Sequence, residues 1–180
     1  MPPIINADFA ARLRKFRPDW LTLLLIGLIV YFWFRPPAWV SEEHRALPPL
    51  QFELLDGRRI ASEDLRGKVV LVNFWATWCP YCRHEMPDME RYYRDTQGRG
   101  FEIVALSQDD DAATARRFMA EEGYRFPAAM ADGSHAAAFG GISRLPTSFL
   151  IDKQGRLRQK ISGQVHYARL EDLVEPLLKE

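Results

Sequence analysis

Residues 69–75 form a nearly continuous apolar run, Val-Val-Leu-Val-Asn-Phe-Trp. Such a run is typical of a strand that is buried on both faces of a sheet, because a strand with one wet face alternates polar and apolar residues. A sheet of this kind needs helices on both sides. The run therefore predicts an α/β domain, and residues 101–106, Phe-Glu-Ile-Val-Ala-Leu, supply a second central strand.

The remainder of the chain after residue 46 alternates between strand and helix patterns. Residues 50–60 predict a hairpin, because Asp56-Gly57 is a hairpin turn signal. We expect one mixed-sheet domain over 47–180, since about 135 residues are enough to bury a single core. Its other expected elements are a helical turn at 62–65, helices at 80–97, 112–122, 134–139 and 168–178, and strands at 126–130, 148–152 and 157–162.

The two cysteines stand where the buried strand gives way to the next helix, in the sequence Cys79-Pro80-Tyr81-Cys82. Proline fits the first position of a helix, so Cys79 is expected to cap the helix N-terminus. The free N–H groups and the helix dipole favour a thiolate there. Cys82 lies one turn further on, at a separation that suits a disulfide. We expect Cys79 to be the exposed nucleophile and Cys82 the more buried thiol that resolves a mixed disulfide.

Three other roles for the cysteine pair are less well supported. A structural disulfide usually links distant segments, since closing a four-residue loop constrains little of the unfolded chain. Haem attachment requires His directly after the second Cys, but Arg83 stands there. A zinc site needs two more ligands with paired spacing. The histidines are scattered, at His44, His84, His135 and His166. The sequence therefore favours redox catalysis by the cysteines, with no metal or other cofactor.

The N-terminal segment carries an uncharged run of fifteen residues at 20–34. As a helix it spans roughly 22 Å, which is short for a hydrocarbon core of roughly 30 Å and long enough for a signal peptide. Aromatic residues near both ends, Trp20, Tyr31, Trp33 and Trp39, favour an uncleaved anchor. A cleaved signal peptide and a buried core helix remain the alternatives.

The flanks of this run indicate an orientation. Four basic residues precede it, and these predict a cytoplasmic N-terminus: Arg12, Arg14, Lys15 and Arg17. Pro36-Pro37 ends the helix. We expect a cytoplasmic basic tail at 1–19, a transmembrane signal anchor at 20–35 and a linker at 36–46. The whole chain balances 24 Lys and Arg against 24 Asp and Glu, so net charge gives no attraction to nucleic acid.

Residues 74–87, Phe-Trp-Ala-Thr-Trp-Cys-Pro-Tyr-Cys-Arg-His-Glu-Met-Pro, resemble the active-site segment of the thioredoxin superfamily. More narrowly, they resemble the membrane-anchored TlpA/ResA-type thiol–disulfide oxidoreductases. Leu145-Pro146-Thr147 and the strand after it are similar to the superfamily's cis-proline segment. The resemblance covers about residues 47–180. It implies a thioredoxin-like α/β fold with an N-terminal β-hairpin and a central insertion, which we assign to the strand and helix at 101–122.

The resemblance also implies roles for individual residues. Pro146 is the expected cis-proline facing the disulfide, and the backbone of Leu145 is expected to pair with the substrate polypeptide. Trp78 is expected to flank the nucleophile. The dipeptide Pro80-Tyr81 also occurs in glutaredoxins, but those are shorter and lack an anchor, so we interpret it as a tuning element. A peroxiredoxin is a further alternative, although its register of Thr before the nucleophile is not matched here.

One position departs from thioredoxins themselves, which place a buried Asp six residues before the first Cys. Here that residue is Asn73, which cannot titrate. The proton of Cys82 must then be exchanged with another group. Glu85, one turn after Cys82, is our candidate, and members of this family often have an acid there. The alternative is that Glu85 is a solvated helix residue.

The sequence thus predicts a thiol–disulfide oxidoreductase at a bacterial inner membrane, with its catalytic domain in the periplasm. It is expected to exchange disulfides with exported proteins, more as a reductase than as an oxidase. The resemblance implies two classes of client for a reductase: proteins of cytochrome c maturation, and metal-centre or copper-stress proteins. A reductase needs electrons from a thiol-reducing membrane partner, and an oxidase needs a quinone-linked oxidant. A non-catalytic client-binding module is the alternative from a different class.

Overall fold

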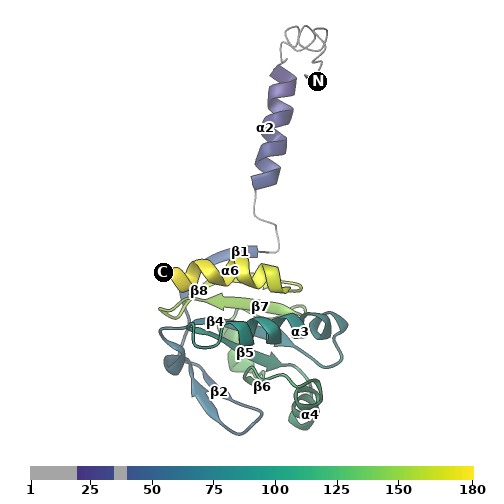
Figure 1. Cartoon of the computed structure of the whole chain (residues 1–180), viewed down its shortest axis with the longest axis vertical. Coiled ribbons are helices and arrows are strands. Elements are labelled where there is room, and N and C mark those ends of the chain that lie inside the picture. The colour runs from purple at the N-terminus through teal and green to yellow at the C-terminus, as the bar shows by residue number, and fades with distance from the viewer. Residues whose placement is uncertain (1–19, 35–39) are drawn as a thin grey trace, which may run out of the picture. The chain divides into compact units, whose positions relative to one another are not determined.

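The computed structural model describes residues 20–34 and 40–180 (Figure 1). The chain divides into two compact units, Met1–Pro37 and Ala38–Glu180. In the first unit, helix α2 covers Trp20–Phe34. The basic tail expected at 1–19 and the prolines at 36–37 lie outside the described residues. No helix in the part of the chain described here has both the length and the apolar character needed to cross a membrane.

The second unit alternates strands and helices largely as the sequence predicts. Its strands are β1 (Val40–Ala46), β2 (Gln51–Glu53), β3 (Arg59–Ala61), β4 (Val69–Trp75), β5 (Phe101–Ser107), β6 (Ala128–Met130), β7 (Thr147–Ile151) and β8 (Arg156–Ser162). Its helices are the 3₁₀ turn η1 (Ser62–Leu65), α3 (Pro80–Asp95), α4 (Ala112–Glu122), α5 (Gly133–Ala138) and α6 (Tyr167–Lys179).

Six of these strands form one mixed sheet in the order β1-β8-β7-β4-β5-β6. β4 lies in its interior, parallel to β5 and antiparallel to β7. All seven residues of β4 are buried, which confirms the prediction from its apolar run. The expected hairpin is β2–β3, a separate two-stranded sheet. A bridge between Leu54 and Ala129 joins it to β6.

Successive side chains of the central strands enter two different cores, because a strand alternates its faces. One core lies against α3, α4 and α6, and it receives Leu71 and Trp75 from β4. The other lies against the hairpin, η1 and α5, and it receives Val72 and Phe74. α3 and α6 run side by side over the face of the sheet that carries Leu71 and Trp75 (Figure 1). Asn73 shares the face of Leu71 and Trp75, so its side chain points toward α3.

The prediction of a linker at 36–46 is wrong from Val40 onward. Residues 40–46 form β1, which pairs antiparallel with β8 at the edge of the sheet. The sequence Val-Ser-Glu-Glu-His-Arg-Ala is too polar to suggest a strand, but an edge strand with one partner tolerates charged residues. A register shift between Glu42 and Arg45 interrupts the pairing.

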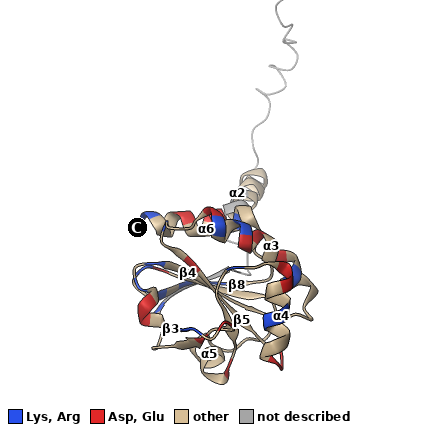
Figure 2. Ribbon diagram, turned by 60° about the horizontal axis from the view of Figure 1, so that its bottom comes forward, with Lys and Arg blue, Asp and Glu red and all other residues tan. Residues whose placement is uncertain are grey.

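The insertion expected at 101–122 is also wrong in its first half. β5 pairs with β4 on one side and β6 on the other, so it belongs to the centre of the sheet. Only α4, which follows β5, lies outside the sheet. The N-cap of α4 is Asp111, and Gly123 ends the helix with a left-handed φ of 72°, as predicted. Charged residues of both signs are spread over the outer helices (Figure 2).

His135 has no role predicted from the sequence, but in the structure it links the hairpin β2–β3 to α5. It is buried and stacks on Phe52, with ring centroids 5.1 Å apart. Its Nδ1 accepts from the N–H of Asp132, and its Nε2 lies 3.0 Å from the carbonyl oxygen of Gln51.

We predict that His135→Ala lowers the free energy of unfolding by about 2–3 kcal/mol, because it empties a packed site and leaves buried polar groups without partners. Urea denaturation of the full chain measures the effect. His84→Ala, at an exposed histidine, is the matched control and should change stability by less than about 0.5 kcal/mol. Equal effects of the two substitutions would contradict this role.

Candidate active site

The two cysteines form a disulfide at the N-terminus of α3. Cys79 is the N-cap of the helix and Pro80 occupies its first turn, as predicted. The Sγ of Cys79 accepts from the N–H of Cys82 at 3.2 Å, so a backbone donor of the first turn points at the sulfur. This donor and the positive end of the helix dipole stabilise negative charge on Cys79.

The cysteines are less exposed than the sequence suggested. Cys79 is 4% exposed and Cys82 is fully buried. The predicted order of exposure therefore holds, but Cys79 is not an open surface residue in the disulfide form. The aromatic rings of Trp78 and Tyr81 flank the pair, and each is 67% exposed. Large apolar side chains left in water beside a reactive disulfide provide a contact surface for another protein.

The bond between Leu145 and Pro146 is cis, as the resemblance implies. Pro146 is buried, and Leu145 is half-buried and packs against both cores. The carbonyl of Pro146 accepts from the N–H of Gly163 at 2.9 Å. The segment before β7 is thereby held to the loop that follows β8.

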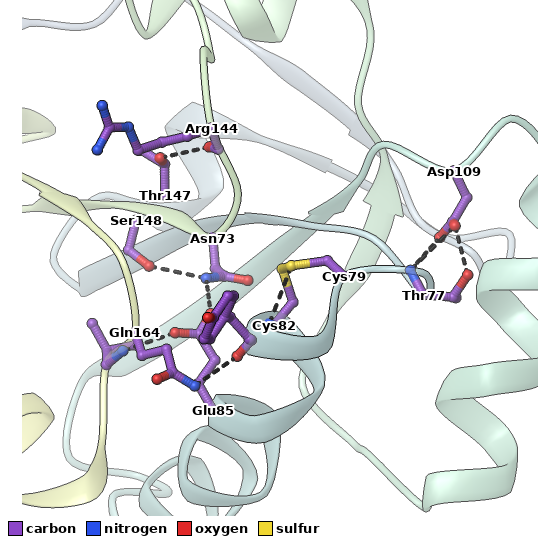
Figure 3. The surroundings of a disulfide bond; sticks show 12 residues. Asn73, Thr77, Cys79, Cys82, Glu85, Asp109, Arg144, Thr147, Ser148 and Gln164 are labelled. Carbon is purple, nitrogen blue, oxygen red and sulfur yellow. Dashed lines mark hydrogen bonds between the residues drawn. A yellow bond between two sulfur atoms is a disulfide. The ribbon is translucent and has the colours of Figure 1, made fainter.

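Glu85 lies at the centre of a buried hydrogen-bond network below the disulfide (Figure 3). Its Oε1 accepts from Asn73 Nδ2 at 2.8 Å, and its Oε2 accepts from the N–H of Val165 at 2.8 Å. The same Nδ2 also donates to the Oγ of Ser148 at 2.9 Å. Glu85 and Asn73 are both fully buried, so the interpretation of Glu85 as a solvated helix residue is wrong.

Burial raises the pKa of Glu85 to about 8, because the charged carboxylate loses its hydration. The N–H donors of Val165 and Asn73 favour the charged form and lower the pKa in part. A carboxyl group whose pKa lies near neutrality can both take up and release a proton under physiological conditions. Its position one turn after Cys82 places it beside the thiol that must lose a proton.

Two further residues near the cysteines were not identified from the sequence. Asp109, which is buried, accepts from the N–H and the hydroxyl of Thr77, two residues before Cys79. Gln164 donates from its Nε2 to the carbonyl of Tyr81 at 3.0 Å. Asp109 is the first of three consecutive aspartates after β5, and the pattern alone does not show which of them turns inward.

The comparisons with known proteins agree with this geometry. The model of the Redoxin family matches residues 42–174.

The chain belongs to the Redoxin family. Within it, the chain is 38% identical over 123 residues to the thiol-disulfide oxidoreductase ResA of Bacillus thuringiensis (strain Al Hakam), a match that covers 68% of this chain and 71% of that protein. It is 33% identical over 132 residues to ResA of Bacillus subtilis (strain 168), covering 72% and 74%.

A solved structure of a related protein is similar in fold. A thiol:disulfide interchange protein of the thioredoxin family from Chlorobium tepidum TLS superimposes with a TM-score of 0.71 at 33% identity. The match covers 77% of this chain and 99% of that one. The domain thus has the thioredoxin-like fold, and this Redoxin family member is a thiol–disulfide oxidoreductase.

Stability should depend on pH through Glu85. The pKa is about 8 in the folded disulfide form and about 4.3 in an unfolded chain. Between these values the folded state holds a proton that the unfolded state has released, so stability falls as pH rises. The stabilising effect of the neutral carboxyl is complete below about pH 4 and is lost as pH rises through about 8.

We therefore predict that Glu85→Gln removes this decline and makes the oxidised protein more stable than wild type at pH 9, by a few kcal/mol. Urea denaturation from pH 5 to 9 measures it. The exposed Glu121 on α4 provides the control: Glu121→Gln should follow the wild-type curve. A decline that persists in Glu85→Gln would show that another group causes it.

Proposed function

We propose that this protein is a membrane-tethered disulfide reductase that acts on exported client proteins. The observation that carries the proposal is the buried carboxyl of Glu85 one turn from Cys82, held by Asn73 and Val165. The exposed rings of Trp78 and Tyr81 support recognition of a client polypeptide.

The proposed direction of electron flow is supported by the charges around the cysteines. The N-terminus of α3 stabilises a thiolate on Cys79 by about 0.3–2 kcal/mol. An ionised Glu85 in a buried site opposes a thiolate nearby, because like charges repel strongly where water is excluded. The disulfide has no charge and does not feel this repulsion. Where Glu85 is ionised, which its pKa of about 8 permits increasingly as pH rises, the carboxylate favours the disulfide over the dithiol, and a protein whose disulfide is favoured is a reductant.

The reaction proceeds by two exchanges. The Cys79 thiolate attacks a client disulfide, forms a mixed disulfide and releases one client thiolate. Cys82 then passes its proton to the Glu85 carboxylate and attacks the Sγ of Cys79. The second client thiolate leaves, the Cys79–Cys82 disulfide closes, and the client has gained two electrons.

The N-terminal unit supports a tether. α2 has no charged residue, and Trp20 at its start is exposed, as befits an interfacial ring. Its fifteen residues measure roughly 22 Å, and the sequence next to it supplies Arg17 and Arg35, a residue type whose long side chain can extend the effective span of a short segment. The basic residues before α2 favour a cytoplasmic N-terminus and hence a periplasmic catalytic domain.

For clients we propose proteins whose cysteines must be kept reduced outside the cytoplasm. These are haem-binding cysteine pairs during cytochrome c maturation, or cysteines of metal-centre and copper-stress proteins. The periplasm is kept oxidising, so the reduced form must be regenerated by a thiol-reducing partner in the membrane. If the protein instead runs as an oxidase, that partner is a quinone-linked oxidant.

The proton transfer predicts a pH profile. In wild type, the rate constant for resolution of the mixed disulfide should rise with pH through about 8, as Glu85 ionises. Glu85→Gln should lose this rise and be at least about tenfold slower at pH 8.5, because it has no base for the Cys82 proton. Stopped-flow Trp fluorescence measures the rate, and Glu121→Gln is the control. An unchanged profile would remove Glu85 from the mechanism.

The proposed direction of electron flow predicts the reduction potential of the Cys79–Cys82 pair. Full-chain protein in detergent, equilibrated with glutathione buffers, should give a reduction potential near or below that of thioredoxin, about −270 mV. A value near that of DsbA, about −120 mV, would make the protein an oxidase. Cys82→Ala should trap clients as mixed disulfides on Cys79. A wild-type protein that binds clients and exchanges no disulfide would be a binding module.

A further inference from the structure

The side-chain oxygen of Asn73 is a buried acceptor with no hydrogen-bond partner in this disulfide form. Asn73 lies in the middle of the central strand β4 and is fully buried. Most buried polar atoms are paired, and one without a partner calls for a physical reason. Its amide nitrogen, in contrast, donates two hydrogen bonds. Within this one amide group, the nitrogen donates two hydrogen bonds and the oxygen accepts none.

The two donated bonds fix which way the amide faces. Nδ2 donates to Glu85 Oε1 and to Ser148 Oγ, at 2.8 and 2.9 Å. The structure places the nitrogen on that side, between the Glu85 carboxyl and the Ser148 hydroxyl, and both of these groups can accept from it. Oδ1 is thereby turned the other way, and Figure 3 shows it pointing toward the Cys79–Cys82 disulfide.

The disulfide offers this oxygen no donor, because neither sulfur carries a hydrogen. Reduction adds two electrons and two protons, and breaks the bond between the sulfurs. The buried Cys82 then holds an S–H, which is a hydrogen-bond donor. Cys82 precedes Glu85 by one helical turn, and Glu85 lies within hydrogen-bond distance of Asn73. The new donor thus arises on the turn of α3 that Asn73 already faces.

We propose that Asn73 Oδ1 accepts a hydrogen bond from the Cys82 thiol in the reduced protein, which makes Asn73 a positioning residue of the exchange reaction. The same amide then holds the thiol at one end and the carboxylate that receives its proton at the other. The inference rests on thiol–disulfide exchange at Cys79 and Cys82, and it is independent of the direction of electron flow, the client and the tether.

The contact has a thermodynamic consequence. It is made only in the dithiol, while the disulfide leaves a buried acceptor unpaired. Asn73 therefore stabilises the reduced form relative to the oxidised form and counteracts the effect of Glu85. Replacing Asn73 by an apolar residue of similar size removes the bond from one state and the unpaired oxygen from the other.

The first test is the equilibrium of the full chain with glutathione in detergent, measured in a Glu85→Gln background so that no change in the charge of Glu85 contributes. Asn73→Leu should shift it toward the disulfide by roughly tenfold, from the lost bond and the removed unpaired acceptor. Val72→Ala, a neighbour that faces the opposite core, controls for loss of packing and should leave the equilibrium within twofold. A shift of less than twofold in folded Asn73→Leu, or an equal shift in Val72→Ala, would overturn the proposal.

The second test observes the thiol and needs no change at Asn73. In the full-chain Cys79→Ser variant, Cys82 is the sole cysteine, so the infrared S–H stretch reports it alone. We expect a band shifted below that of a free thiol. A band at the free-thiol position would overturn the proposal even if Asn73→Leu does not fold. Where it folds, Cys79→Ser/Asn73→Leu should return the band to that position, and Cys79→Ser/Asn73→Asp, which keeps an acceptor oxygen, should hold it low.

Discussion

The hydrogen bond between Asn73 Nδ2 and Glu85 Oε1 is the contact on which the arrangement of the active site depends. It joins the central strand β4 to the helix that carries both cysteines. Glu85 extends the link to Val165, before α6, and Asn73 extends it to Ser148 on β7. Four segments, namely β4, α3, β7 and the loop before α6, therefore meet at one amide and one carboxyl. The Glu85 carboxyl is fully buried, and its charged form is tolerated there only because such N–H donors replace part of its lost hydration.

The same contact explains why the pKa of Glu85 stops near neutrality. Burial alone pushes the pKa of a carboxyl upward, and each N–H donor pulls it back. With two donors the result is about 8, a value at which the group can change its charge during turnover. A thioredoxin-like site with Asn in place of the buried Asp thus retains a titratable group. This group, Glu85, lies on helix α3 and not on strand β4, so it is on the same element as the Cys82 thiol whose proton it accepts.

Some of these features can be predicted from the sequence, and others cannot. The apolar run at 69–75 predicted β4, and Pro80 at the start of a helix predicted Cys79 as the N-cap, because both rest on local rules. β1 was missed because an edge strand needs no apolar alternation. The inward turn of Asp109 was missed because neighbouring aspartates in a run look alike. Glu85 was found only through the resemblance, since nothing local distinguishes a buried glutamate from a solvated one.

A division of labour between strand and helix follows from these positions. β4 is paired on both sides and buried throughout, so the Asn73 amide is fixed by a rigid sheet. Cys82 and Glu85 lie one turn apart on α3, so the helix sets their spacing. Reduction adds two electrons and two protons at the sulfurs, on the turn of α3 that Asn73 faces. The Asn73 amide is held by its hydrogen bonds to Glu85 and Ser148, so the sheet sets the position from which its oxygen would accept the proposed hydrogen bond from the Cys82 thiol.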